Sequence, residues 1–339
     1  MKKLFIAVLS MATLASCFQS EFAVNQAIDF NTYVGSTTKA IDPSINNDNI
    51  TDHSFYVWGT TQENITGAPI VPIFKNVEVD YVGGVWKYNP QYTQYWFSGN
   101  KYNFAAVVNG VVDEATLVNG LPKTISYTAG TDLDLLYART AQDITRDSNG
   151  AATVAFTFEH LLSKAVFTFT NTTPANTNGA PANIYKVTNI EISGLDAAAV
   201  YDVESGWTNN ANADLDVVFG NIVASIESDT NNTAAIEVKE QESGKSLYEH
   251  LLIPGTHNVT ISCNIVLYNG VADADHVVKT IPYSETHTIT LGKGKAYNFA
   301  LSAGLEEIID FKVNTVNEWE NGNTADGDSD GVNDHYPIL

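Results

Sequence analysis

Segments in which apolar and polar residues alternate recur along almost the whole chain, and no other feature limits its possible folds so strongly. In residues 164–172, for example, Val166, Thr168 and Thr170 alternate with Phe167 and Phe169. A period of two residues is typical of a β-strand with one buried face, whereas an amphipathic helix needs apolar residues at a period near 3.6. The clearest such segments are 54–60, 68–75, 101–108, 152–160, 164–172, 185–194, 257–268, 287–292 and 296–302.

Clusters of Gly, Asn, Asp and Pro separate these segments, as turns separate the strands of an antiparallel protein. Helix is expected only in short connectors such as residues 113–118. The sequence therefore predicts an all-β protein made of antiparallel β-sandwich domains rather than of βαβ units. The chain length favours two domains in tandem, and the polar stretch 144–152 places their boundary near residue 150, with domains at 40–150 and 151–339.

The first residues have the features of an export signal. Lys2 and Lys3 precede an apolar stretch that is too short to remain as a membrane-spanning helix. The stretch ends in LASC at residues 14–17, the pattern of a bacterial lipobox. We therefore expect residues 1–16 to be a signal peptide and Cys17 to carry lipid, such as palmitate, that anchors the chain to a membrane. The alternative is an ordinary signal peptide with an incidental cysteine.

The mature chain is expected to be strongly acidic. Removing residues 1–16 takes away Lys2 and Lys3 but no acid, so 17 basic residues become 15 against 39 acidic ones, a formal charge of −24. Such a surface repels phosphate backbones. Nucleic acid is therefore excluded as a partner class.

No residue pattern of a catalytic site stands out. The SGKS sequence at 243–246 lacks the glycine that a phosphate-binding loop needs five positions before its Gly-Lys pair, because Lys239 stands there. The histidines are scattered without metal-ligand spacing, and His160, beside an apolar strand, is expected to be structural. Cys263 lies on the same predicted strand face as Ile261, Ile265 and Leu267 and is expected to be a buried apolar residue rather than a nucleophile. The sequence predicts that the protein is not an enzyme.

The acidic stretch 325–335 is the best candidate for a metal site. Four aspartates follow a spacing of oxygen donors that suits Ca²⁺, namely Asp326, Asp328, Asp330 and Asp334. An EF-hand loop would end in a glutamate at its twelfth position, where this chain has Pro337. A solvated acidic run is the other interpretation, and no further cofactor is predicted.

Aromatic residues gather in the stretch 85–104. It contains Trp86, Tyr88, Tyr92, Tyr95, Trp96, Tyr102 and Phe104. Such a cluster has two interpretations, because aromatic rings form platforms on which sugars stack and also fill the core of a sandwich. The first interpretation gives an alternative function for the whole chain, a surface glycan-binding lipoprotein.

The stretch 27–40 alternates like a strand and then reaches an isolated lysine. One face of this strand would carry Ile28, Phe30, Thr32 and Val34. Lys39 is the only Lys or Arg between Lys3 and Lys75. The residues alone allow an ordinary first strand followed by a surface lysine.

Several landmarks occur together in one order along the chain. They are the lipobox at Cys17, IDFNTYVGSTTKAID (28–42), FYVWG (55–59), WKYNPQYTQYWFSGNKYNFAA (86–106), FTFEHLLSKAVFTFTN (156–171), LLIPG (251–255), GKAYNFAL (294–301) and VNEW (316–319). On this ordered set the chain resembles the fimbrillins of Bacteroidales type V pili, the FimA-like and Mfa-like surface lipoproteins. The resemblance implies two transthyretin-like or fimbrillin-like sandwiches in series. It also implies a fimbrial subunit at the outer membrane and cell surface that supports adhesion.

The resemblance further implies how such a subunit assembles. In that family a surface protease cuts the exported lipoprotein after a basic residue, and removal of the N-terminal strand leaves a groove that a strand of another subunit fills. For this chain the implied cut lies between Lys39 and Ala40, although many family members have arginine at the cut. The implied removable strand lies in residues 17–39 and carries Ile28, Phe30, Thr32 and Val34.

The donor strand has two candidates. The tail that contains Tyr336, Ile338 and Leu339 can insert into a neighbour, and so can the longer strand at 308–316. The implied partners are other fimbrial subunits, the surface protease, the membrane through the lipid anchor, and a ligand on a host or bacterial surface. Stalk, anchor and tip subunits are not distinguished by the sequence.

Overall fold

Strands dominate the computed structural model, which describes residues 26–34, 45–130, 133–146, 153–171, 183–209, 214–225, 249–269, 275, 277–303 and 308–318. Helix in these residues is limited to the 3₁₀ turns Ile50–Asp52, Pro90–Tyr92 and Glu114–Thr116 and to a 3₁₀ residue at Asp275. The predicted all-β class is confirmed, and the third turn lies in the connector where helix was expected. Among the described residues, no helix has the length and hydropathy needed to cross a bilayer.

Strands occur throughout the described part of the chain, and the longest of them lie in its second half. Their bounds are β1 Asp29–Val34, β2 Phe55–Glu63, β3 Val71–Val82, β4 Val85–Tyr88, β5 Asn100–Val108, β6 Thr124–Thr128, β7 Leu136–Arg139, β8 Thr153–His160, β9 Ser163–Asn171, β10 Asn183–Asp196, β11 Ala198–Asp202, β12 Gly206–Asn209, β13 Asp214–Ser225, β14 Glu249–Leu252, β15 Gly255–Asn269, β16 Val277–Leu291, β17 Lys295–Ala303 and β18 Ile308–Glu318.

The first half of the chain builds a seven-stranded sheet in the order β1-β8-β7-β5-β2-β3-β4. The sheet curls, since its two edge strands meet where Tyr88 of β4 contacts Phe30 of β1. One face encloses an aromatic-rich core, to which the sheet and its loops contribute Phe30, Phe55, Phe74, Trp96, Tyr102, Phe104, Phe156 and Phe158. We call this set, with its aliphatic neighbours, the first core.

A smaller sheet in the order β12-β11-β6 packs on the opposite face of the central strands. The contact buries Trp58 and Val107 of the large sheet against Ile125, Tyr127 and Ala199 of the small one. Strand β5 therefore has both faces covered, which explains why its second half is a continuous apolar run rather than an alternating one.

The two strands β11 and β12 join this second sheet from the later half of the chain, while β6 comes from the earlier half. Strand β8, which follows residue 150, belongs to the seven-stranded sheet. Strand pairing thus links residues on both sides of the predicted boundary. The domain limits at 150 and 151 stay a prediction, because pairing alone does not divide a chain into folding units.

The later half forms a β-sandwich of two four-stranded sheets, β13-β10-β15-β16 and β14-β9-β17-β18. Between them lies a core of aliphatic and aromatic side chains, which includes Val187, Ile192, Ile261, Ile265, Phe299 and Leu301. Cys263 is buried in this core, and burial raises the pKa of its thiol to about 12. The thiol therefore behaves as the buried apolar group that the sequence predicts.

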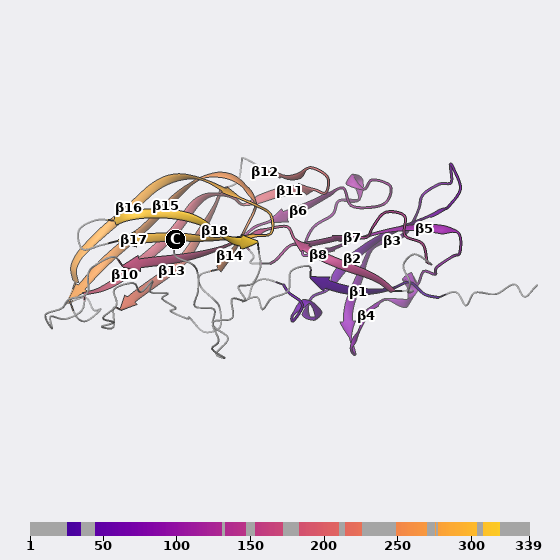
Figure 1. The fold of residues 1–339 in the computed structure, drawn as a ribbon, viewed down its shortest axis with the longest axis horizontal. Coiled ribbons are helices and arrows are strands. Elements are labelled where there is room, and N and C mark those ends of the chain that lie inside the picture. Colours follow the sequence, from indigo (N-terminus) through magenta and orange to yellow (C-terminus); the bar gives the residue numbers. More distant parts are fainter. Residues whose placement is uncertain are drawn as a thin grey trace, which may run out of the picture.

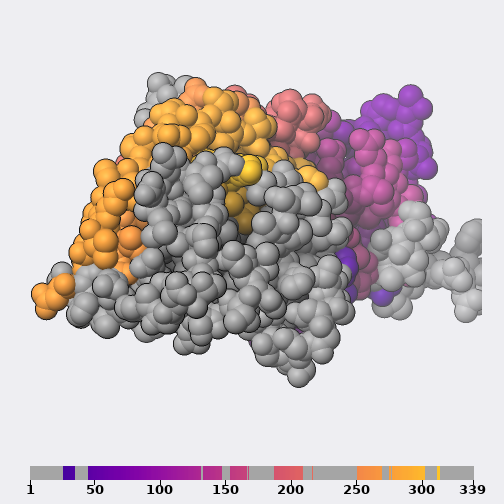
Figure 2. Space-filling view, turned by 60° about the vertical axis from the view of Figure 1, so that its left-hand side comes forward, coloured from indigo at the N-terminus to yellow at the C-terminus, as the bar shows by residue number. Residues whose placement is uncertain are grey.

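Most strand pairs among the described residues are antiparallel, with two exceptions. Strand β1 pairs with β8 in parallel, and β17 pairs with β9 in parallel. In Figure 1 the seven-stranded sheet lies at one end of an elongated molecule, the β13-β10-β15-β16 and β14-β9-β17-β18 sheets lie at the other, and β6, β11 and β12 lie between them. The space-filling view in Figure 2 shows the orange strands of the later half forming the flank opposite the indigo and magenta strands.

Candidate functional site: the seat of the N-terminal strand

Strand β1 is hydrogen-bonded to the body of the molecule along two sides. On one side it runs parallel to β8, from the pair Asp29–Thr153 to the pair Val34–Phe158. On the other side, just before the strand begins, the Ile28 amide donates to the Gln94 carbonyl at 2.9 Å, and the Trp96 amide donates to the Gln26 carbonyl at 3.1 Å. We call the surroundings of residues 26–34 the β1 seat. They comprise β8, Tyr88, residues 94–96, Asn47 and the first-core rings that touch Phe30.

The side chains of β1 alternate between the core and solvent, as the sequence predicts for this stretch. Ile28 and Val34 are fully buried and Phe30 is 4% exposed, whereas Tyr33 on the other face is 46% exposed. Thr32 shares the inner face, is partly buried, and has a hydroxyl oxygen with no hydrogen-bond partner among the described residues. The inner face is therefore part of the first core rather than a covering on its surface.

Phe30 occupies a pocket of aromatic rings. Its ring centroid lies 5.2 Å from Phe74, 5.7 Å from Phe156, 5.7 Å from Tyr88 and 6.1 Å from Phe104. The contact with Phe156 is stacked and those with Phe74 and Phe104 are edge-to-face, which are the favoured arrangements of aromatic pairs. These rings come from β3, β4, β5 and β8, so one side chain of β1 touches four other strands.

Tyr88 closes the seat from the β4 side. Its hydroxyl donates a hydrogen bond of 2.7 Å to the Ile28 carbonyl. Burial raises the pKa of Tyr88 to about 12, and the nearby Asp29 carboxylate adds to that rise. The phenol therefore stays a neutral hydrogen-bond donor to the N-terminal strand throughout the physiological pH range.

The match to a family model decides the identity of the chain. A model described as fimbrillin-like matches residues 38–319. The chain belongs to the fimbrillin-like family. This membership supports a structural subunit of cell-surface fimbriae that assembles with other fimbrial subunits. The matched region of this fimbrillin-like chain begins after β1 and one residue before Lys39.

One solved structure shares the fold, and a second has a lower similarity. A fimbrial protein from Bacteroides vulgatus has 17% sequence identity and a TM-score of 0.57, with 87% of this chain and 100% of that chain covered. A candidate cell adhesion protein from Bacteroides uniformis has 12% identity and a TM-score of 0.45, covering 86% of this chain and 98% of that one. At these identities the likeness concerns the fold alone. No curated protein matches the chain.

Several predicted site residues lie outside the described part of this fimbrillin-like chain. They are Cys17, Lys39, Ala40, Asp326, Asp328, Asp330, Asp334, Tyr336, Ile338 and Leu339. Their roles in lipidation, cleavage, calcium binding and strand donation stay predictions. Among the residues that the structure describes, no three His, Cys, Asp or Glu side chains gather closely enough to hold a metal ion.

The aromatic stretch 85–104 divides between core and surface. Trp96, Tyr102 and Phe104 are 0–2% exposed and belong to the first core, and Trp86 packs edge-to-face on Phe55. The exposed rings are Tyr92, Tyr95 and Phe97. The core interpretation therefore holds for the buried members. Trp96 is one of them, so its ring is not accessible to a sugar in solution.

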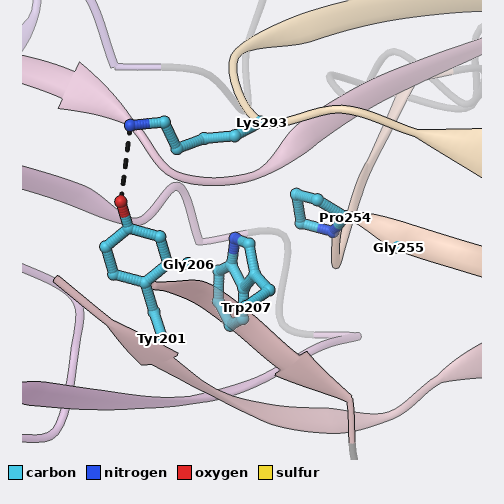
Figure 3. A pocket seen from close by; sticks show the side chains of 6 residues that line it. All are labelled: Tyr201, Gly206, Trp207, Pro254, Gly255 and Lys293. Carbon is cyan, nitrogen blue, oxygen red and sulfur yellow. Dashed lines mark hydrogen bonds between the residues drawn. The ribbon is translucent and has the colours of Figure 1, made fainter. Parts of the chain in front are cut away.

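A pocket lies between the β11–β12 hairpin and the later sandwich (Figure 3). This cavity of about 360 Å³ is lined by Tyr201, Gly206, Trp207, Pro254, Gly255 and Lys293. The Trp207 indole N–H donates to the Leu161 carbonyl at 2.7 Å, and the Lys293 ammonium lies 2.8 Å from a carboxylate oxygen of Glu159. Lys293 also donates to the Tyr201 hydroxyl at 3.4 Å (Figure 3), so the Trp207 and Tyr201 contacts join the hairpin to its neighbours.

Two contributors to the β1 seat were not predicted from the sequence. Tyr88 was assigned only to the aromatic cluster, and its hydrogen bond to Ile28 spans 60 positions of the chain. Asn47 lies in the polar stretch 46–49, whose composition indicates a turn and nothing more. No local sequence signal identifies either contact, because both depend on how distant segments pack.

Proposed function

We propose that this fimbrillin-like protein is a fimbrial subunit that assembles by donor-strand exchange, with β1 as the strand that is exchanged. A protease cuts after Lys39, the segment 17–39 leaves, and a strand of another subunit takes its place. The observation that carries the proposal is that β1 supplies three buried side chains to the first core, Ile28, Phe30 and Val34, yet lies outside the region matched by the family model.

The physical consequence of losing β1 is large. Fully burying one such apolar side chain is worth about 1.5–3 kcal/mol, so removing three of them opens an apolar surface that favours a replacement. The departure also leaves the main-chain groups of β8 unpaired along an edge, which is the surface that an added strand recognises. Main-chain hydrogen bonds would supply affinity, and the buried alternate side chains would supply register.

The route to the cell surface is part of the same proposal. The lipobox at residues 14–17 supports export as a lipoprotein, and acylated Cys17 would hold the precursor at the outer membrane until the cut. Cutting after Lys39 would release the subunit from its anchor. The donor is one of the two candidate segments, the tail with Tyr336, Ile338 and Leu339 or the strand at 308–316, and adhesion through the fimbria is the proposed outcome.

Cleavage and assembly can be tested on the exported chain. Limited digestion with a lysine-specific protease should yield a protein that begins at Ala40 and forms polymers, measured by N-terminal sequencing and light scattering. The Lys39→Ala variant should stay monomeric under the same digestion. Lys75→Ala, which removes the next lysine along the chain, is the matched control and should polymerise like the wild type. A protein that begins at Ala40 and stays monomeric at high concentration would contradict the proposal.

A further inference from the structure

The last residue of β1 is held by a side-chain amide. The Val34 amide donates to Asn47 Oδ1 at 2.7 Å, and Asn47 Nδ2 donates to the Val34 carbonyl at 3.0 Å. The Asn47 side chain thus satisfies both main-chain groups of one residue, as a neighbouring strand would. It recognises the backbone and places no demand on the side chain at that position.

Asn47 is positioned by a turn that is tied to the end of β8. The Asn46 side chain accepts from the Asp48 amide at 2.6 Å, and the Asn46 amide donates to Asn49 Oδ1 at 2.6 Å. The Ile45 amide, in turn, donates to the buried Asp134 carboxylate, which also lies 2.8 Å from His160 Nδ1.

The buried carboxylate of Asp134 therefore connects the turn to the last residue of β8. The turn is fixed relative to the strand against which β1 pairs, so Asn47 holds the backbone at a fixed position along β8.

The chain order separates Asn47 from the residue that it holds. Asn47 follows Lys39, so a cut after Lys39 leaves Asn47 with the subunit, whereas Val34 leaves with the N-terminal segment. The rings around Phe30 belong to β3, β4, β5 and β8 and also stay. After the cut, the Asn47 side chain and the ring pocket are therefore both available to bind an entering strand.

We infer, resting on the proposed function, that the β1 seat selects a strand of another subunit by the spacing between two points. The entering strand lies parallel to β8, places an aromatic side chain in the Phe30 ring pocket, and presents the backbone of the residue four positions later to Asn47. Four residues of strand span about 13 Å. The ring pocket selects the aromatic side chain and with it the register, and Asn47 requires a backbone N–H, which proline lacks, four positions later.

A slipped strand loses contacts in the apolar part of the β1 seat. A slip of one residue turns the apolar face to solvent. A slip of two residues keeps the face but puts the aromatic side chain at the position of Thr32 and leaves the ring pocket filled by a smaller group. Either slip leaves apolar surface unfilled, so only one register fills the ring pocket and the buried positions of β1 while Asn47 binds the backbone.

The inference is tested with protein cut at Lys39 and a fluorescent peptide of residues 26–36, QAIDFNTYVGS. The peptide should replace the native segment, and its affinity should fall about tenfold in Asn47→Ala because two hydrogen bonds are lost. Asn47→Asp keeps the shape but loses the donor to the Val34 carbonyl, and a similar loss is expected. Asn258→Ala, which removes a single exposed side-chain hydrogen bond to Thr288, is the matched control and should bind like the wild type.

A second peptide tests the spacing with unchanged composition. In it, Phe30→Thr and Thr32→Phe are combined. The aromatic side chain then lies two positions before Val34, the residue that Asn47 binds, instead of four. Its affinity should be at least about tenfold lower than that of the native peptide.

The outcomes separate the two proposals. Equal binding by the wild type and Asn47→Ala, or equal binding of the two peptides, would overturn the spacing rule and leave strand exchange standing. Failure of the native peptide to bind the cut wild-type protein would overturn strand exchange and the spacing rule together.

Discussion

Phe30 shows how one residue can tie an N-terminal strand to a whole core. Its ring contacts four others, and Gly59 of β2 is part of the reason that two of them fit. A Cβ at position 59 would lie 2.7 Å from Phe104 and 2.9 Å from Phe74, closer than carbon atoms approach. Glycine at this position therefore lets the rings beneath Phe30 pack against the sheet.

Truncating Phe30 should be costly in the uncut chain. We expect Phe30→Ala to lower the free energy of unfolding by about 3–5 kcal/mol, because it empties a filled aromatic pocket. Tyr33→Ala, on the exposed face of the same strand, should change it by no more than about 0.5 kcal/mol. Urea titration followed by fluorescence measures both. Equal effects of the two substitutions would show that β1 does not contribute its inner face to the core.

At the scale of elements, pairing partners explain the patterns of the strands. Strand β1 alternates because only one of its faces is covered, whereas the second half of β5 is apolar throughout because the first core lies on one side and the small sheet on the other. Strand β8 also alternates, and its buried residues Val154, Phe156 and Phe158 form the apolar surface next to the inner face of β1. Strand β1 is thus an edge strand whose inner face belongs to the core.

Tyr88 of β4 should report whether β1 is in its seat. With the strand present, burial and Asp29 raise the pKa of Tyr88 to about 12 from its ordinary value of 10.0. A raised pKa means that the neutral phenol is favoured, so the contribution of Tyr88 to strand binding is complete below about pH 10 and is lost as the pH rises toward 12.

Removing β1 takes away Asp29 and uncovers the phenol. The pKa of Tyr88 should then fall toward 10. NMR titration of tyrosine labelled at the ring carbon that bears the hydroxyl measures this, and the Tyr88→Phe variant assigns the signal. An unchanged pKa after release of the strand would contradict the described contact.

At the scale of the whole molecule, net charge acts on assembly. The formal charge is −22 for the full chain and becomes −24 without residues 1–16, so subunits repel one another at long range. The seat itself is apolar and main-chain in character, so strand binding does not depend on that charge. Repulsion should slow the encounter between subunits rather than weaken the inserted strand.

Salt should therefore accelerate assembly. Screening extends over about 30 Å at 10 mM salt and about 8 Å at 150 mM, so the polymerisation rate of the cut protein should rise several-fold between these conditions. Light scattering after cleavage measures the rate, and the Lys39→Ala variant provides the baseline at each salt concentration. A rate that falls with added salt would mean that attraction between unlike charges guides the encounter.

The sequence by itself determined the strand content, the inner face of β1, the burial of Cys263 and the structural place of His160. Each of these follows from local alternation, because side chains on a strand point to opposite faces whatever the partner strand is. The ordered landmarks also identified the fimbrillin-like family.

Only the tertiary structure decided which strands pair. The parallel β1–β8 contact, the return of β11 to β6, and the hydrogen bonds of Tyr88 and Asn47 to the N-terminal strand all join segments distant in the chain. Periodicity shows which face of a strand is apolar but not which neighbour covers it. That choice depends on how all the strands pack together, and no single segment of the sequence contains it.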